Sequence, residues 1–561
     1  MRKPVKSRSG GDPRRAKLAH ADGELTMRPH PVFATIVLSL VVSVAVFFGW
    51  PVSAQPPGQT VLPAPPRVFL DTSYRSPSGR TIAVGSGGNL QAALNTAQPG
   101  DVITLASGAT FVGNFSLPNK AGSGWIVVRS AAADDKLPAA GIRVTPPFFP
   151  AMPKILSPNQ NPAVYTESGA HHYRFIGIEF STTAGVKEIY SIVAFGGVQE
   201  SEAETPHDMI LDRCYVHGHP ELASRRGVLL NGASSAIIDS HISDIHAAGA
   251  DAQAVLGYNG PGPFKIVNNF LEGAGENVMF GGADPKIRGL VPSDIEIRRN
   301  HFFKPLSWRP GDPSFAGVQW TVKNLLELKN AQRVLVEGNL LENNWGGHGL
   351  VLTPRNQSGT APWSVVQDVL FRSNIVKNSG DGFVVLSSDS EGRSEPARRI
   401  AIVNNLWLGV TGRLFLAVGG RSVPLEDLLV DHNTAIPGGY AAYWVEAVLV
   451  RFRYTNNLVG FGRWGVSYPT PDVVAKSARG AIIGRNALVS LSGGEGAESN
   501  RPPGVDQAMY ASFPDAAAAG INADGTLTAK SPNRRAGTDG KDIGVDFDEL
   551  LRAYTGQPLR K

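Results

Sequence analysis

Cysteine is almost absent from this sequence, since Cys214 is the only one among 561 residues. A single thiol excludes an intramolecular disulfide framework, so the core and its hydrogen bonds must hold the chain together. Charged residues are also sparse, at 18% of the chain. The net charge of +5 comes entirely from residues 1–54, which hold eight Lys or Arg and three Asp or Glu, whereas the remainder holds 45 of each sign. This balance gives no support for nucleic acid or an anionic membrane surface as a partner.

Long apolar runs are equally scarce, and the one that stands out covers residues 32–50. The small residues Val52-Ser53-Ala54 follow it, which predicts an export signal cleaved after Ala54. Met27 would make a more ordinary start for such a signal than the first residue of the chain. We therefore expect an exported protein, either secreted, periplasmic or at the cell surface. The run is longer than a usual signal core, so a membrane anchor over residues 32–50 is the alternative.

What the sequence does contain is a recurring pattern of alternating apolar residues, then Asn, then another apolar residue, as in KIVNNF at 265–270 and AIVNNLW at 401–407. The aligned residues are Asn269, Asn300, Asn339, Asn374, Asn405, Asn433 and Asn457, with weaker copies at Cys214, Ser240 and Asn486. Successive clear copies lie 24 to 39 residues apart. A repeat of this length cannot bury its apolar face alone, which predicts a stacked solenoid. Asn at one fixed place predicts an internal ladder of amide hydrogen bonds between coils.

A second apolar strand follows each Asn turn, for example GVLLNG at 227–232, ENVMFGG at 276–282 and DGFVVLS at 381–387. Each coil therefore carries at least two strands, and coils stacked about 4.8 Å apart bring their outward residues into continuous columns. The predicted fold is all-β, a right-handed parallel β-helix. The longest steps, from Asn300 to Asn339 and on to Asn374, indicate inserted loops, which is where function usually lies on a rigid scaffold.

Two flanking segments extend this interpretation. The stretch 82–118 suggests a short capping helix followed by strands, and 531–554 suggests a closing coil and an irregular C-terminal cap. Together with the coils, they resemble right-handed β-helix proteins of the pectate-lyase-like fold, over roughly residues 80–550. The predicted organisation is a Pro-rich linker at 55–80, the β-helix at 81–550 and a tail at 551–561. The resemblance implies a group rich in polysaccharide lyases with some hydrolases, but no catalytic motif can be matched residue by residue.

The most polar block of strands and loops lies between residues 244 and 357. Alternation predicts that Asp251 and Gln253 face outward while Ala252, Ala254 and Leu256 face the core, and that Lys323, Leu325 and Glu327 face outward. Glu276 is in phase with the apolar Val278 and Phe280, so its exposure would require a bend. Asp251, the Glu276/Asn277 pair, Lys323 and His348 fall on successive coils, which predicts a column of ionisable groups.

Such a column suits β-elimination of a uronate, which needs a base and a cation that neutralises the sugar carboxylate. Lys323 is a candidate base, His348 a candidate base or acid, and Arg355 a candidate clamp for the carboxylate. Glu276 and Asp284 are candidate Ca²⁺ ligands. Trp345 could stack on a sugar ring, and the other candidate substrate contacts are Asp251, Gln253, Asn277, Glu327, Asn343, Asn344 and Gln357. Each also has a structural alternative, since Lys323 and Glu327 could be solvated surface charges and Trp345 a loop anchor.

The leading functional hypothesis is an exported lyase that acts on acidic polysaccharides. The alternatives are a β-helix glycoside hydrolase that uses carboxylates such as Asp251 and Glu276, and a non-catalytic glycan-binding or cell-surface β-helix. The glycan and the oligomeric state are left open by the sequence, and a membrane contact is expected only if the segment 32–50 is retained.

Overall fold

The computed structural model describes residues 59–418, 423–436, 441–446, 448–461, 465–467, 481–490 and 510–557. The predicted export segment lies outside these ranges. Among the described residues, no helix is long and apolar enough to cross a membrane.

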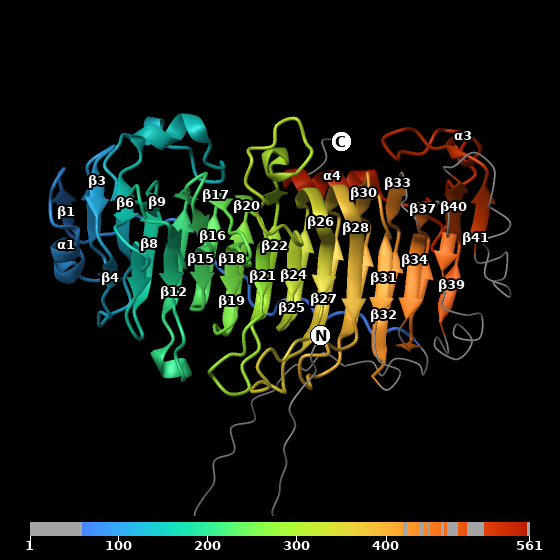
Figure 1. Ribbon diagram of the computed structural model, residues 1–561, viewed down its shortest axis with the longest axis horizontal. Helices are drawn as coiled ribbons and strands as arrows, with labels where there is room; N and C mark the ends of the chain where they lie inside the picture. Colours follow the sequence, from blue (N-terminus) through green and yellow to red (C-terminus); the bar gives the residue numbers. More distant parts are fainter. Residues whose placement is uncertain are drawn as a thin grey trace, which may run out of the picture. The chain divides into compact units, whose positions relative to one another are not determined.

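Strands of successive coils lie side by side and pair in parallel, from β1 at one end to β41 at the other (Figure 1). The first series consists of β1 (Thr81–Val84), β2 (Val102–Leu105), β5 (Ile126–Ser130), β8 (His171–Ile176), β12 (His207–Asp212), β16 (Ala233–Ile238), β19 (Gly262–Val267), β22 (Ser293–Arg298), β25 (Ala331–Glu337), β27 (Val366–Arg372), β29 (Arg398–Val403), β32 (Leu425–Asp431), β36 (Arg453–Thr455) and β39 (Ile482–Gly484).

The second series begins after the Asn turn of each coil. It consists of β3 (Thr110–Val112), β6 (Lys154–Ser157), β9 (Glu179–Thr182), β13 (Tyr215–His217), β17 (His241–Ile245), β20 (Phe270–Gly273), β23 (His301–Phe303), β26 (Leu340–Leu352), β28 (Ile375–Leu386), β30 (Leu406–Leu408), β33 (Thr434–Ile436), β37 (Leu458–Phe461), β40 (Asn486–Ser490) and β41 (Tyr510–Phe513).

The third series completes the coil. It consists of β4 (Phe115–Leu117), β7 (Val164–Thr166), β11 (Val193–Phe195), β15 (Arg226–Leu230), β18 (Gln253–Gly257), β21 (Glu276–Phe280), β24 (Leu326–Leu328), the later parts of β26 and β28, β31 (Phe415–Val418), β34 (Ala441–Glu446) and β38 (Gly465–Ser467). The two long strands β26 and β28 join the second and third series.

These pairings confirm the predicted fold, a parallel β-helix of the pectate-lyase-like type. The predicted capping helix is α1 (Leu90–Thr96). Asn89 is its N-cap residue, and the Asn89 side chain accepts a hydrogen bond from the Ala92 N–H. Leu90 and Leu94 of α1 belong to the same buried cluster as the strand side chains of the coils. The helix therefore covers apolar surface that the first coil would otherwise leave open.

The predicted Asn ladder is confirmed. Each side-chain amide donates to the side-chain oxygen of the next Asn at 2.9–3.1 Å, through the series Asn269, Asn300, Asn339, Asn374, Asn405, Asn433, Asn457 and Asn486. Ser240 and Cys214 extend it, because Asn269 accepts from the Ser240 N–H and Ser240 accepts from the Cys214 N–H. The residue before each of these Asn residues is in the left-handed region, with φ between 51° and 65°. The ladder therefore satisfies a buried turn in each coil from Cys214 to Asn486.

The C-terminal segment differs from the expected end cap. A short helix, α3 (Ala516–Ala519), packs on the last described strands β40 and β41. Residues 538–556, the C-terminal strap, instead run back along the Asn turns. Within this strap, Thr538 bonds to Asn456, Asp546 bonds to Asn404, and the helix α4 (Phe547–Thr555) reaches Gly338. A Cβ at Gly338 would collide with the α4 backbone, which explains a glycine at this turn.

The Pro-rich segment is likewise not a free linker in this structure. Residues 60–74, the N-terminal strap, lie across the first series of strands. The N–H groups of Val61, Ala64 and Arg67 donate to the carboxylates of Asp427, Asp368 and Asp294 at 2.8–3.0 Å. These aspartates lie two coils apart. Each pairs at 2.6–2.7 Å with an arginine on the next coil: Asp427 with Arg451, Asp368 with Arg399, and Asp294 with Arg333.

The spacing of these contacts has a simple geometric origin. Three residues of polyproline II helix rise about 9.3 Å, and two coils of a parallel β-helix rise about 9.6 Å. A strap with a free N–H at every third residue can therefore bind an aspartate on every second coil. The prolines at 63, 65 and 66 lack an N–H and fall between the bonded positions.

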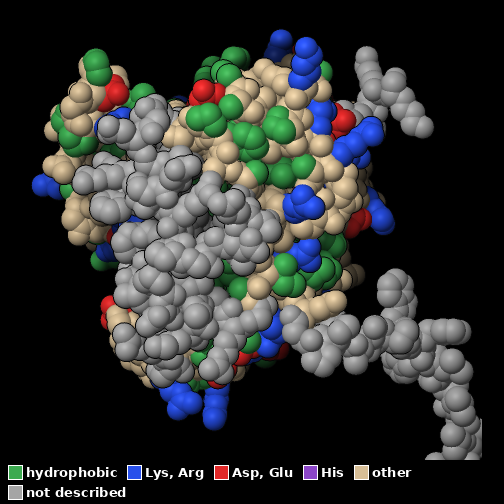
Figure 2. Space-filling view, turned by 90° about the vertical axis from the view of Figure 1, so that its right-hand side faces the viewer, with side chains coloured by type: hydrophobic (Ala, Val, Ile, Leu, Met, Phe, Trp, Pro, Cys, Tyr) green, Lys and Arg blue, Asp and Glu red, His purple; other side chains and the backbone are tan. Residues whose placement is uncertain are grey.

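The exposed surface at the C-terminal end is mixed in character. Viewed from this end, lysine and arginine side chains are scattered among apolar and uncharged ones in the part that the structure describes (Figure 2). In the described part of this face the basic side chains lie apart from one another and do not form one continuous basic patch.

Candidate functional site

A column of polar side chains crosses the start of the third strand series, close to the predicted one. Strand register aligns Arg226 with Gln253, Gln253 with Glu276, and His348 with Asp381. The same register, continued two residues before the paired strands begin, places Asn324 between Glu276 and His348, and Arg413 after Asp381. The sequence therefore predicted a real column, but not all its members.

The expected facing of these strands was right in part. In β18, Val255 faces the core with Val278 and Leu326, whereas Leu256 lies in the outward column, the reverse of the expectation. Ala252 and Ala254 are buried in the core as expected, and Glu327 lies in the outward column next to Met279. Gln253 and Glu276 are in phase with the core and are only 2% and 0% exposed. Leu325, predicted to face outward, is completely buried and belongs to the main core cluster.

Lys323 lies at the accessible centre of the site. Its Nζ is 2.9 Å from Asp251 Oδ2 and 3.1 Å from Glu276 Oε1, and about a third of its side chain is exposed. Burial alone would lower the pKa of Lys323, but the carboxylates of Glu276 and Asp251 outweigh it and raise the pKa. Lys323 is therefore a fixed cation and unsuited to be the general base.

Two buried carboxyl groups lie behind this cation. Burial raises the pKa of Glu276 to about 7, and Glu276 accepts a hydrogen bond from Gln253 at 2.8 Å. Burial would also raise the pKa of Glu327, but Lys329, 3.1 Å away, and a hydrogen bond with Glu276 hold it below its usual range. The pKa values of the two groups are thus shifted in opposite directions, so a protonated Glu276 can lie beside a charged Glu327 in a buried place.

Lys304 is a buried member of the site that sequence reasoning missed. Its Nζ donates to the carbonyl oxygens of Gly273, Ala274 and Gly275 at 2.6–3.2 Å, and the residue is fully buried. Burial lowers the pKa of Lys304 to about 7. Lys304 lies between Phe303 and Pro305 after the Asn300 turn, and nothing in this pattern marked it as a site residue. Its hydrogen bonds hold the corner between β20 and β21 in place.

His348 is the accessible group with the properties of a base. Burial lowers the pKa of His348, so its imidazole is neutral at pH 7. Its Nε2 lies 3.4 Å from Asp381 Oδ2, and Asp381 in turn accepts from Arg413 at 2.8 Å. About 40% of the Arg413 side chain is exposed. Arg413 was also missed, because it lies in a plain coil beyond the polar block.

Trp345 lies at the edge of the site, half-buried. It packs with Trp308, Trp320 and Val322 in a small apolar cluster. His246 stacks on Trp320, with ring centroids 3.8 Å apart, and is completely buried. The tryptophan is thus anchored as the alternative interpretation expected, and it remains partly exposed.

Several predicted sugar contacts serve the protein itself. Asn277 is buried and donates to the carbonyl oxygens of Leu271 and Phe303. Asn344 is buried and donates to the carbonyl of His348, and Asn343 accepts from Asn378. These amides shape the corners of the coils and are not presented to a ligand.

Arg355, Gln357 and Asp284 belong to the other end of the strands. Arg355 pairs with Asp389 at 2.7 Å and contacts Gln357, and its N–H bonds to the carbonyl of Lys329. Lys329 is six residues beyond Lys323, or about 20 Å along an extended strand. Arg355 therefore does not share a site with Lys323.

The proposed pairing of Glu276 with Asp284 as calcium ligands is not seen. Asp284 accepts three hydrogen bonds from Ser358 and Thr360, whereas Glu276 faces Lys323. A cation beside Glu276 would have to displace the Lys323 ammonium, so these residues do not fit a calcium site.

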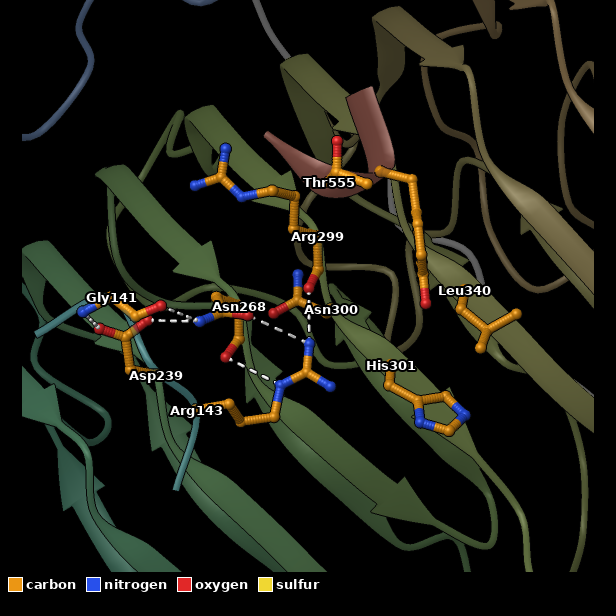
Figure 3. Close-up of a pocket in the computed structure, with 10 residues that line it drawn as sticks. Gly141, Arg143, Asp239, Asn268, Arg299, Asn300, His301, Leu340 and Thr555 are labelled. Atoms are coloured by element: carbon orange, nitrogen blue, oxygen red, sulfur yellow. Dashed lines mark hydrogen bonds between the residues drawn. The ribbon is translucent and has the colours of Figure 1, made fainter. Parts of the chain in front are cut away.

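A separate hollow of about 380 Å³ lies beside the Asn turns (Figure 3). Arg143 projects into it and donates to the carbonyls of Asn268 and Arg299, and the Arg299 side chain extends along its wall. Asp239, also in the wall, already accepts from the Gly141 N–H and the Asn268 amide. The guanidinium groups of Arg143 and Arg299 point in different directions, so they do not converge on one anionic group (Figure 3).

No known family model and no curated protein matches this sequence. Solved structures with a similar arrangement include an alginate lyase from Paenibacillus sp. str. FPU-7, with 11% identity, 66% of this chain and 99% of that chain covered, and a TM-score of 0.32. A mannuronic acid specific polysaccharide family 6 lyase from human gut microbiota has 11% identity, coverage of 78% and 92%, and a TM-score of 0.43. A GH87 alpha-1,3-glucanase from Streptomyces thermodiastaticus strain HF3-3 has 13% identity, coverage of 79% and 69%, and a TM-score of 0.39. At these values the likeness concerns the β-helix fold alone.

Proposed function

We propose that this protein is an exported enzyme that cleaves an acidic polysaccharide by β-elimination at the column formed by Lys323, His348 and Arg413. The observation that carries the proposal is a neutral, partly exposed imidazole with a fixed cation on each side along the stack of coils. Elimination of a uronate requires this combination of a base and positive charge.

His348 is assigned the role of the base. The hydrogen beside the carboxyl group of a uronate is weakly acidic, and a neutral imidazole can accept it without first losing a proton. Asp381, at 3.4 Å, would stabilise the imidazolium that forms. This role replaces that of Lys323, whose ammonium is held by two carboxylates.

Lys323 and Arg413 are assigned the role of neutralising the sugar carboxylate. Both carry fixed positive charge and are partly exposed, at 34% and 40% of their side chains. The enolate-like charge that develops on the carboxylate strengthens its attraction to them in the transition state. Trp345, half-buried at the same edge, offers an apolar face to a sugar ring.

The experiment is a panel of acidic polysaccharides incubated with the full chain, followed by ultraviolet absorbance of the unsaturated uronate product. We expect absorbance to grow on one glycan class. His348→Gln should reduce kcat by about 10²–10⁴-fold, and Arg413→Ala by about 10²–10³-fold. His219→Gln, on a histidine outside the column, is the matched control and should leave the rate unchanged.

The other hypotheses give different outcomes in the same panel. New reducing ends without absorbance would mean hydrolysis, which has less support because Glu276 is completely buried and cannot reach a sugar. Binding without any product would mean a glycan-binding role. Full activity in His348→Gln would refute the assignment of the base even if elimination occurs.

A further inference from the structure

Outside this column, three imidazoles and a carboxylate meet at the start of β8 and β12. His171 and His172 begin β8, and His207 and Asp208 begin β12. Strand register pairs His171 with His207, so these four residues occupy two adjacent coils. Three of the twelve histidines of the chain are therefore gathered at one place, with all four side chains partly exposed.

The ligand atoms are close enough to share one ion. Asp208 Oδ2 lies 2.6 Å from His207 Nδ1 and 3.9 Å from His172 Nδ1, and a set of one atom from each residue fits within 4.8 Å. A tetrahedral zinc ion with bonds of 2.0–2.2 Å keeps its ligand atoms about 3.3 Å apart. The observed distances bracket this value, so small side-chain rotations would complete the coordination.

The third imidazole adds to the crowding. His171 Nδ1 lies 2.8 Å from His172 Nδ1, and the His171 ring stacks on that of His207 with centroids 4.8 Å apart. Two imidazole nitrogens at this distance must share a proton when no ion is present. A divalent ion bound to His172 Nδ1 would take the place of that proton on His172 and leave His171 as a neighbour of the site.

We infer that His172, His207 and Asp208 form a binding site for a zinc-class divalent ion, with His171 beside it. Two imidazoles and one carboxylate favour Zn²⁺, Cu²⁺ or Ni²⁺ over Ca²⁺ or Mg²⁺, which prefer oxygen ligands. Because the ligands come from two adjacent coils, the ion would cross-link them. The inference is independent of the proposed enzymatic function.

A simpler interpretation of the same residues comes from a second ladder, which consists of the aspartate–arginine pairs under the N-terminal strap. His172 and Asp208 occupy its left-handed column, with φ of 59° and 55°, in which Asp294 and Arg333 lie three and four coils beyond Asp208 and pair with each other. His172 could be only a weak cation in that ladder. Its 3.9 Å distance from Asp208, against 2.7 Å for Arg333 and Asp294, argues for a gap that another group can fill.

The test is titration of the chelator-treated full chain with Zn²⁺ by calorimetry, and with Co²⁺ by visible absorption. We expect about one ion per chain, and ligand-field bands of a nitrogen-containing site with Co²⁺. His207→Gln and Asp208→Asn should each weaken binding at least about tenfold. His219→Gln is the matched control and should bind as the original chain does.

One further variant separates the two interpretations. His172→Arg would supply the guanidinium that the ladder uses elsewhere, so a ladder role predicts retained or increased melting temperature. The metal site predicts that His172→Arg folds but loses the Co²⁺ bands. Binding that is unchanged in both His172→Arg and His207→Gln, or absent from the original chain, would overturn the inference.

Discussion

Replacement of Asn374 by Ala should strongly destabilise the β-helix, because this residue lies in the middle of the ladder. Its Oδ1 accepts from the Asn339 N–H at 3.0 Å and from the Asn339 amide at 2.9 Å. Its Nδ2 donates to the carbonyl of Val336 and to Asn405 Oδ1. Asn374 is completely buried, so water cannot replace these partners without rearrangement of the coils.

The magnitude follows from the groups left without partners. Asn374→Ala leaves the buried backbone N–H of Asn339 unbonded, whereas the Asn339 side-chain amide keeps the carbonyl oxygens of Ile297 and Glu337. Val336 and Asn405 each lose one donor. An unsatisfied buried donor costs about 1–3 kcal/mol, which is the expected loss of unfolding free energy. Neighbouring coils stabilise one another, so the loss should reduce the stability of the whole unit and not only of one coil.

The assay is urea-induced unfolding followed by circular dichroism, with Asn95→Ala as the control. Asn95 is exposed on α1, and its replacement should change stability by less than about 0.5 kcal/mol. A loss in Asn374→Ala of less than about 1 kcal/mol would refute the reasoning, since it would mean that the ladder bonds are replaced at little cost.

Three further predictions follow from other regions. Asp368→Asn should release the middle of the N-terminal strap, seen as faster hydrogen exchange at Ala64, because the carboxylate that holds Arg399 loses its charge. Burial lowers the pKa of His246 to about 4, so the unfolded chain binds a proton at this histidine before the folded chain does. The free energy of unfolding should therefore fall by up to about 3 kcal/mol as pH falls from 6.5 to 4. Urea unfolding of His246→Phe should show a smaller loss over that range. The acid limb of kcat/KM should follow a pKa below the usual value of histidine, because His348 must be neutral to act and burial lowers its pKa.

The fold was predictable because Asn recurs at the same position of successive coils. The ladder needs an Asn at this position, after a residue in the left-handed region, in each coil that it crosses. The repeat is therefore visible in the sequence although the other residues of the coils differ. The docking of the two straps was not predictable. It depends on the match between the polyproline II rise and the coil spacing, and on acceptors hundreds of residues away.

The site was predictable only in part, for a reason specific to parallel sheets. Their strands are apolar on both faces, so alternation in DAQAVLG does not say which of Val255 and Leu256 faces the core. Lys323, Asp251 and Glu276 were brought together as expected. Arg355 was misplaced, because it lies beside Lys329 at the far end of β24, about 20 Å of extended chain from Lys323.

The measurement that tests the central claim most directly is a crystal structure of His348→Gln with an acidic oligosaccharide from the cleaved glycan class. We expect a sugar carboxylate within hydrogen-bonding distance of Lys323 or Arg413, with the reacting carbon above position 348. An oligosaccharide bound elsewhere, such as in the hollow lined by Arg143 and Arg299, with the column left free, would contradict the account.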